Sequence, residues 1–169
     1  MNIFTAETDE HYQQVRGLTA EYIAWDVSRT AELGLDPDEL LRFQYNDGRE
    51  ALPGEYAPPT GCLLLATHDA KVAGCGAFHK LTPEACEMKR VYVRPEFRGL
   101  GLGRLLATTL IANATDVGYI QMRLETVTFM GTAISLYESL GFHACNPYYV
   151  IPESFRPITV FMELDLRRQ

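Results

Sequence analysis

The sequence lacks the ligand pairs of a metal site. Its four cysteines include no Cys-x-x-Cys pair, and its four histidines are scattered along the chain. Zinc sites use paired ligands at short spacing, so we expect no metal cofactor and interpret the cysteines as buried free thiols. The residues concerned are Cys62, Cys75, Cys86, Cys145, His11, His68, His79 and His143.

Long apolar runs and an excess of positive charge are also missing. No stretch approaches the roughly 18 consecutive apolar residues of a membrane-spanning helix, and residues 1–7 show no basic start followed by an apolar run. With 15 Lys and Arg against 22 Asp and Glu, the net charge of -7 disfavours nucleic acid and anionic lipid as partners. We therefore expect a cytoplasmic protein with no nucleic-acid or membrane partner, and a cationic small molecule suits its charge better.

The amino-acid composition of the chain is typical of a globular domain. The chain has 169 residues, of which 47% are hydrophobic and 22% charged, and a domain of this size buries roughly 70% of the surface that its unfolded chain exposes. No internal repeat is visible, and the Pro- and Gly-rich segment 52–61 is interpreted as a long loop rather than a linker. We expect a single domain that spans residues 1–169.

Apolar periodicity predicts a succession of helices and strands. Helices are predicted at about 9–33, 38–45, 103–118 and 132–140, and Asn46-Asp47-Gly48 is predicted to end the second one. Strands are predicted at about 2–6, 62–68, 72–81, 86–93, 119–127, 142–151 and 158–166. Three antiparallel strands followed by strand–helix–strand crossovers indicate a mixed sheet with helices on its faces.

The most informative segment follows the predicted strand 86–93 and opens the next helix. It reads Arg98-Gly99-Leu100-Gly101-Leu102-Gly103-Arg104. Alternating glycines let an anion approach the backbone N–H groups without obstruction by Cβ atoms, and a helix N-terminus adds free N–H donors and the positive end of the helix dipole. The segment therefore indicates a phosphate-binding loop, although glycines alone are also compatible with a tight connection that binds nothing.

Two other nucleotide-binding loops do not match this segment. A Gly-x-Gly-x-x-Gly dinucleotide loop would need a glycine at position 104 or 106, where Arg104 and Leu106 stand. A P-loop would need Lys and then Ser or Thr after its last glycine, but Gly103 is followed by Arg104 and Leu105. Both classes of nucleotide site are disfavoured.

The pattern Arg-x-x-Gly-x-Gly at 98–103 resembles the signature of the GNAT superfamily of N-acetyltransferases. The segment 87–93 resembles the fourth strand of that family and 133–142 its second motif, so the resemblance is strong over 62–142. It implies a mixed, mostly antiparallel sheet of about seven strands flanked by about four helices. It also implies transfer of an acetyl group from acetyl-CoA to a primary amine, directly within a ternary complex.

The resemblance implies which residues bind acetyl-CoA. The pantetheine arm is expected to pair with the backbone of Val91 and Val93, while the loop 98–103 holds the pyrophosphate. The backbone N–H of Val91 or Tyr92 is expected to stabilise the oxyanion. The expected cofactor-binding residues are Val91, Tyr92, Val93, Arg98, Gly99, Leu100, Gly101, Leu102, Gly103 and Arg104.

Two catalytic residues are also expected. Tyr137 matches the family tyrosine that protonates the departing thiolate, although an ordinary half-buried aromatic residue is the other interpretation. Glu87 matches a glutamate of histone acetyltransferases in this superfamily and is the candidate base for an amine whose pKa is near 10. Strand alternation predicts that Glu87 shares a face with Lys89, Val91 and Val93; a surface ion pair is the alternative role for Glu87.

The acceptor is not identified by the sequence. An amino acid, a polyamine, an aminoglycoside and a protein amine all remain open, and either a monomer or a homodimer is expected. Specificity is expected to come from the first two helices, the loop 52–61, and the segment 145–157 with Tyr148, Tyr149 and Arg156. Two rival functions are a catalytically silent acyl-CoA-binding regulatory module and a nucleotide-binding protein.

Overall fold

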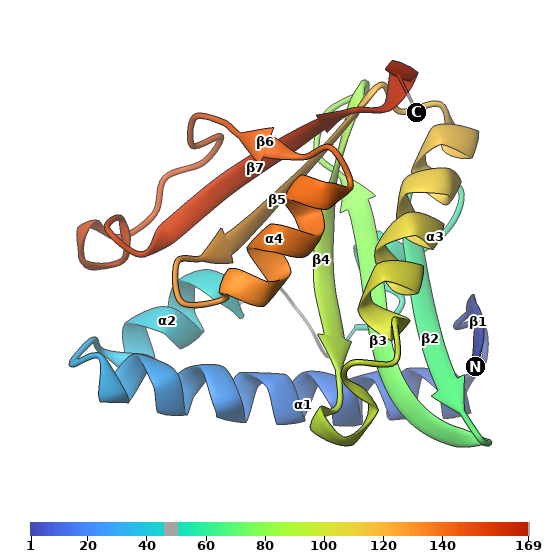
Figure 1. Ribbon diagram of the computed structural model, residues 1–169, viewed down its shortest axis with the longest axis horizontal. Helices are drawn as coiled ribbons and strands as arrows, with labels where there is room; N and C mark the ends of the chain where they lie inside the picture. The colour runs from blue at the N-terminus through green and yellow to red at the C-terminus, as the bar shows by residue number, and fades with distance from the viewer. Residues whose placement is uncertain (46–50, 169) are drawn as a thin grey trace.

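The computed structural model describes residues 1–45 and 51–168, which form a seven-stranded sheet and four α-helices (Figure 1). The strands are β1 (Asn2–Thr5), β2 (Cys62–His68), β3 (Lys71–Lys80), β4 (Ala85–Val93), β5 (Gln121–Val127), β6 (His143–Ala144) and β7 (Thr159–Asp165). The helices are α1 (Asp9–Glu32), α2 (Pro37–Gln44), α3 (Leu102–Val117) and α4 (Gly131–Ser139). The strands lie in the sheet in the order β1-β2-β3-β4-β5-β7-β6. Among these strands of the described residues, β4 and β5 form the one parallel pair, and all other neighbours are antiparallel. The predicted mixed, mostly antiparallel sheet with about four helices is confirmed.

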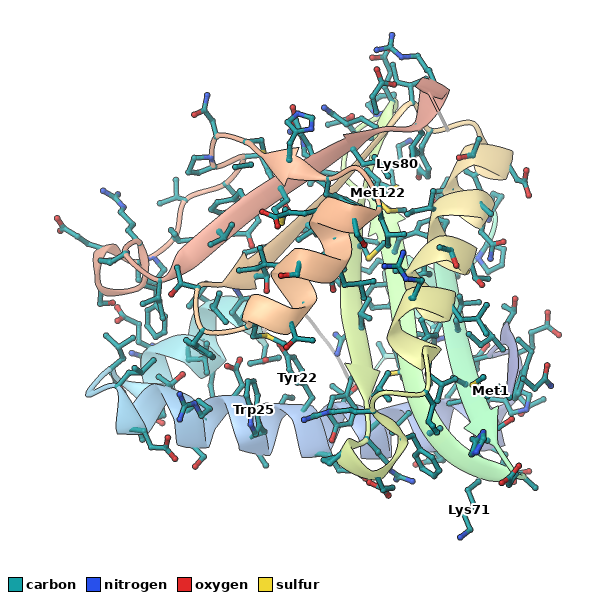
Figure 2. All side chains as sticks on the ribbon, in the orientation of Figure 1. Met1, Tyr22, Trp25, Lys71, Lys80 and Met122 are labelled. Atoms are coloured by element: carbon teal, nitrogen blue, oxygen red, sulfur yellow. The ribbon has the colours of Figure 1, made fainter. Side chains whose placement is uncertain are left out.

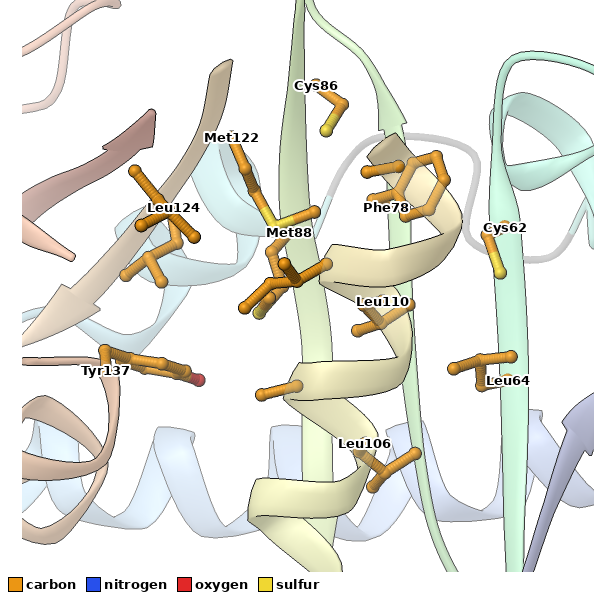
Figure 3. Close-up of a cluster of buried hydrophobic side chains, with 14 of the residues drawn as sticks. Cys62, Leu64, Phe78, Cys86, Met88, Leu106, Leu110, Met122, Leu124 and Tyr137 are labelled. Carbon is orange, nitrogen blue, oxygen red and sulfur yellow. The ribbon is translucent and has the colours of Figure 1, made fainter. Parts of the chain in front are cut away.

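Helices cover both faces of the sheet. Helix α3 packs on one face, where Leu106 and Leu110 join the largest buried cluster together with Leu64 of β2 and Met88 of β4 (Figure 3). Helix α1 packs on the opposite face, against a second cluster that includes Leu63 and Leu65. Because successive side chains of β2 point to opposite faces of the sheet, this strand contributes to both layers of the core.

The first two helices begin at side-chain caps. The Thr8 hydroxyl accepts a hydrogen bond from the His11 N–H at the start of α1, and the Asp36 carboxylate accepts one from the Asp38 N–H at the start of α2. Helix α1 runs without a break over 24 residues. The predicted helix-ending sequence Asn46-Asp47-Gly48 lies outside the described residues.

The sheet opens into a fork between its two parallel strands. Pairing of β4 with β5 runs from Ala85–Gln121 to Met88–Leu124 and stops there, although β4 continues to Val93 and β5 to Val127. Figure 1 shows the two strands diverging beyond this point. Beyond this point, the N–H and C=O groups on the facing edges of β4 and β5 do not bond to each other and are available to other hydrogen-bond partners.

A β-bulge in β4 changes which side chains share a face. Cys75 pairs with Tyr92 and Ala77 with Lys89, so two residues of β4 lie opposite one residue of β3, and Arg90 has a φ of 58°. The bulge places Tyr92 on the α1 face, while Val91 and Val93 pack with the α3-side cluster.

The predicted common face of Glu87, Val91 and Val93 is therefore wrong. Glu87 pairs with His79 on β3 before the bulge, and one extra residue reverses the alternation after it. Strict period-two counting holds only for an uninterrupted strand.

The predicted strand 142–151 is also too long. Strand β6 ends at Ala144, the Cys145 N–H makes one more hydrogen bond to the Phe161 carbonyl, and Pro147, which has no N–H to donate, follows. The following loop packs Tyr148 and Tyr149 on Phe161 of β7, with ring centroids 5.0 and 5.2 Å apart. No helix in the described part of the chain has the length and apolar character needed to cross a membrane.

Candidate active site

An open cleft lies where the end of β4 meets the N-termini of α3 and α4. We call it the loop-side cleft. Of the ten predicted cofactor-binding residues, it is lined by Val91, Tyr92, Val93, Arg98, Gly99, Gly101, Leu102, Gly103 and Arg104. Leu100 does not line it and is 44% exposed. The structure thus brings nearly all of the predicted binding residues together.

The loop before α3 is shaped by two glycines. Gly99 and Gly101 have φ angles of 77° and 83°, in the left-handed region that other residues rarely adopt. Gly101 is the N-cap residue of α3 and provides no side chain to cap the helix. The first N–H donors of α3 therefore lack a side-chain acceptor, and the positive end of the helix dipole adds to their attraction for an anion.

Two arginines flank this loop. Nε of Arg98 donates a 3.0 Å hydrogen bond to the Val93 carbonyl, and Nη2 of Arg104 donates a 2.7 Å hydrogen bond to the Ser139 hydroxyl. A guanidinium has five N–H donors, so these bonds orient both side chains and leave donors for a phosphate. The donor set of the loop fits a pyrophosphate.

Tyr137 lies on α4 and lines the same cleft. Its side chain is 8% exposed and packs edge-on against Phe142, and its hydroxyl points away from α4 toward β4 (Figure 3). Burial raises the pKa of Tyr137 to about 12. The phenol is therefore a proton donor at neutral pH.

A second cavity lies on the other side of the fork, between the sheet and helices α1 and α2. We call it the inner cavity. Its polar lining includes Asp26 of α1, Gln44 of α2, Lys89 and Arg90 of β4, and Glu125 of β5.

Three aromatic side chains line both the inner cavity and the loop-side cleft: Tyr22, Tyr92 and Phe129. Figure 2 shows Tyr22 and Trp25 projecting from α1 toward the start of α4. The two cavities therefore adjoin each other at the fork.

Both carboxylates of the inner cavity are partly withdrawn from water. Burial raises the pKa of Asp26, although the Tyr45 hydroxyl donates a 2.7 Å hydrogen bond to it. Burial also raises the pKa of Glu125, against the hydrogen bonds from Tyr149 and Gln44. Neither residue was singled out by its sequence context, because their proximity depends on how α1 packs on the sheet.

Glu87 is not among the described residues that line either cavity. It is 3% exposed and is held by Nε2 of His79 at 2.9 Å and the Tyr148 hydroxyl at 2.7 Å. Burial acts to raise the pKa of Glu87, but these bonds and the Lys89 ammonium at 3.9 Å outweigh it, so the pKa is lowered. Its predicted role as the base stays a prediction.

The four cysteines are free thiols, and burial raises the pKa of Cys75 and of Cys86 to about 12. Within residues 1–45 and 51–168, no group of three or more His, Cys, Asp or Glu side chains is arranged to hold a metal ion.

The forked sheet and the glycine loop at the N-terminus of the next helix are the arrangement expected of the N-acetyltransferase class. The model of the acetyltransferase (GNAT) family matches residues 21–142. The chain belongs to this family.

Two relatives support this membership, and a solved structure shares the fold. An uncharacterized N-acetyltransferase of Dictyostelium discoideum is 46% identical, over 99% of this chain and all of the relative. An uncharacterized N-acetyltransferase of Schizosaccharomyces pombe is 41% identical, over 81% of this chain and 82% of the relative. The structure of the Salmonella typhimurium protein yncA with its cofactor acetyl-CoA is 24% identical, with a TM-score of 0.63 over 98% of this chain and 94% of that chain.

Proposed function

We propose that the protein is an acyl-CoA-dependent N-acetyltransferase that moves the acetyl group of acetyl-CoA to a primary amine. The observation that carries the proposal is the uncapped N-terminus of α3, which lies in one cleft with Tyr137. Family membership and the acetyl-CoA complex of the Salmonella protein support acetyl-CoA as the phosphate-bearing ligand.

In this proposal the loop binds the pyrophosphate of acetyl-CoA. Backbone N–H groups from Gly99 to Gly103 face the phosphates, and Arg98 and Arg104 add positive charge. The amide groups of the pantetheine arm pair with the backbone of Val91 and Val93, on the edge of β4 that β5 leaves open. The thioester is then placed at the fork.

The chemistry follows from the groups at this point. The amine nitrogen attacks the thioester carbonyl carbon, and the backbone N–H of Val91 or Tyr92 stabilises the oxyanion that forms. When the C–S bond breaks, the Tyr137 hydroxyl donates its proton to the thiolate of CoA. The raised pKa of Tyr137 ensures that this proton is present at neutral pH.

Direct transfer is favoured over an acyl-cysteine intermediate. A thiolate is the nucleophilic form of cysteine, and burial raises the pKa of Cys86, the cysteine of β4 that precedes Glu87, to about 12. Cys86 is therefore a thiol at neutral pH, and the acetyl group passes to the amine within the ternary complex.

An amine panel tests the proposal. The protein is incubated with acetyl-CoA and lysine, spermidine, kanamycin or a peptide with a free N-terminus, and acetylated products are measured by mass spectrometry. Acetyl-CoA, NAD and ATP are compared by thermal shift, since a ligand at about 100 times its Kd adds about 2.7 kcal/mol of stability. Stabilisation by acetyl-CoA without any product would indicate a silent binding module, and stabilisation by ATP or NAD instead would indicate a nucleotide-binding protein.

A further inference from the structure

The fork between β4 and β5 places a carboxylate at its junction. Met88 and Leu124 form the last pair between the two strands, so Glu125 is the first residue of β5 beyond that pair. Glu125 also lines the inner cavity, next to the three aromatic side chains that line the loop-side cleft as well. An acceptor in the inner cavity would therefore meet Glu125 on its way to a thioester at the fork.

The Glu125 carboxylate is held in place by two donors. Nε2 of Gln44, on α2, lies 2.5 Å from each carboxylate oxygen, and the hydroxyl of Tyr149 donates to Oε2. A carboxylate has about four acceptor positions, so others remain for an ammonium group. Burial raises the pKa of Glu125 and makes it a stronger base than an exposed glutamate.

The groups that face Glu125 come from both sides of the cavity. Lys89 favours its charged form, whereas Glu87 disfavours it. The tyrosines around it have pKa values raised by burial and stay neutral, so they add no charge, and one of them, Tyr149, donates a hydrogen bond to Oε2 of Glu125. These tyrosines are Tyr22 of α1, Tyr45 after α2, and Tyr148 and Tyr149 of the loop after β6.

The two other carboxylates of this region are less well placed. Asp26 lines the inner cavity from α1 rather than from the fork, and its Oδ2 accepts the Tyr45 hydroxyl. Glu87 lies on β4 before the fork, within the paired part of the strand, and lines neither cavity. Among the carboxylates of the described residues, Glu125 alone combines a position at the fork with access to the inner cavity.

We propose that Glu125 is the catalytic base that takes a proton from the ammonium group of the acceptor bound in the inner cavity. This inference rests on the proposed acetyl transfer. An N–H bond of the ammonium breaks, its proton moves to a Glu125 oxygen, and the freed lone pair attacks the thioester carbon. The C–S bond breaks, and the departing thiolate takes the Tyr137 proton. The nitrogen of the new amide then loses its extra proton, which returns to Tyr137 through solvent. Glu125 releases its proton to water.

Three matched Glu→Gln variants test the proposal. Glu125→Gln and Glu87→Gln remove the two candidate bases, and Glu163→Gln on β7 is the control for a strand glutamate that lines neither cavity. Each variant is assayed for kcat/KM with acetyl-CoA and the amine of the panel that the wild type acetylates fastest. Acetyl-CoA affinity is measured in parallel by calorimetry.

We expect Glu125→Gln to lower kcat/KM by about 100-fold or more near neutral pH, with acetyl-CoA affinity unchanged. The loss should shrink below about tenfold near pH 10, where a lysine-like amine is already half deprotonated and needs no base. A purely structural role would give the same loss at both pH values. Glu163→Gln should behave as the wild type does.

Two results would overturn the assignment. One is a Glu125→Gln loss that does not depend on pH; the other is a pH-dependent loss in Glu87→Gln while Glu125→Gln stays within about threefold of the wild type. Failure of the proposed function is distinct, because the wild type itself would then acetylate no amine of the panel, and both proposals would fall.

Discussion

The hydroxyl of Tyr148 donates a 2.7 Å hydrogen bond to Oε1 of Glu87, a residue 61 positions earlier in the chain. This contact ties the loop after β6 to the middle of β4. It also fills one of the acceptor positions of a carboxylate that the sheet and His79 already bury.

Tyr148→Phe should therefore lower stability in a pH-dependent way. A hydrogen bond to a charged group contributes about 1.5–3 kcal/mol, which is the loss expected at neutral pH. The folded-state pKa of Glu87 is lowered from 4.5, so its stabilisation is present above that value and is lost as pH falls through the folded-state pKa. Urea unfolding at a series of pH values from neutral down to acid unfolding measures the difference, and a loss that stays constant over the whole series would refute the link to Glu87.

Tyr137→Phe should lower kcat by about 100-fold or more, because a general acid contributes at least this much, while acetyl-CoA affinity changes little. Since the pKa of Tyr137 is about 12, we expect no loss of kcat up to about pH 10 that originates from this residue. Tyr12→Phe is the control for removal of a phenol hydroxyl outside both cavities. Unchanged turnover in Tyr137→Phe would remove this residue from the mechanism.

The glycines of the loop should respond differently to alanine. Gly101→Ala places a residue with a Cβ atom in the left-handed backbone conformation. This variant should lose about 1–2 kcal/mol of stability and bind acetyl-CoA more weakly. At Gly103 an added Cβ would lie 3.7 Å from Leu136, an ordinary contact, and alanine should stabilise the helix by up to about 1 kcal/mol. Unfolding and calorimetry on the pair measure both effects; equal behaviour of the two variants would contradict the role of the left-handed cap.

The two arginines should act on the pyrophosphate alone. Arg98→Gln and Arg104→Gln should each weaken acetyl-CoA binding by about tenfold, the equivalent of about 1.4 kcal/mol. Binding of acetyl-pantetheine, which has no pyrophosphate, should be unchanged in both variants. If both ligands lost affinity equally, the arginines would instead be supporting the shape of the cleft.

Features that depend on nearby residues were predictable from the sequence. The glycine spacing before α3 and the apolar periodicity of α3 and β5 indicated the phosphate loop and the order of the elements. The bulge at Arg90 was not predictable, because it depends on how β4 pairs with β3. Without it, Glu87 was assigned to the wrong face.

The inner cavity was likewise hidden from the sequence. Asp26 and Glu125 lie 99 positions apart in the numbering, and only the packing of α1 and α2 on the forked sheet brings them into one cavity. The segment with Tyr148 and Tyr149 was expected to contribute to acceptor specificity, and nothing in the sequence indicated that its two hydroxyls donate hydrogen bonds to carboxylates of β4 and β5. Long-range packing decided each of these contacts.

The missing side-chain cap at Gly101 has a consequence for the motion of the protein between turnovers. A helix N-terminus without a side-chain cap frays more readily, so we expect the first turn of α3 to exchange its amide hydrogens quickly when the loop is empty. In the proposed complex, the bound pyrophosphate would supply acceptors for these amide groups and slow that exchange. In each catalytic cycle the first turn of α3 would then become ordered when acetyl-CoA binds and fray again when CoA leaves.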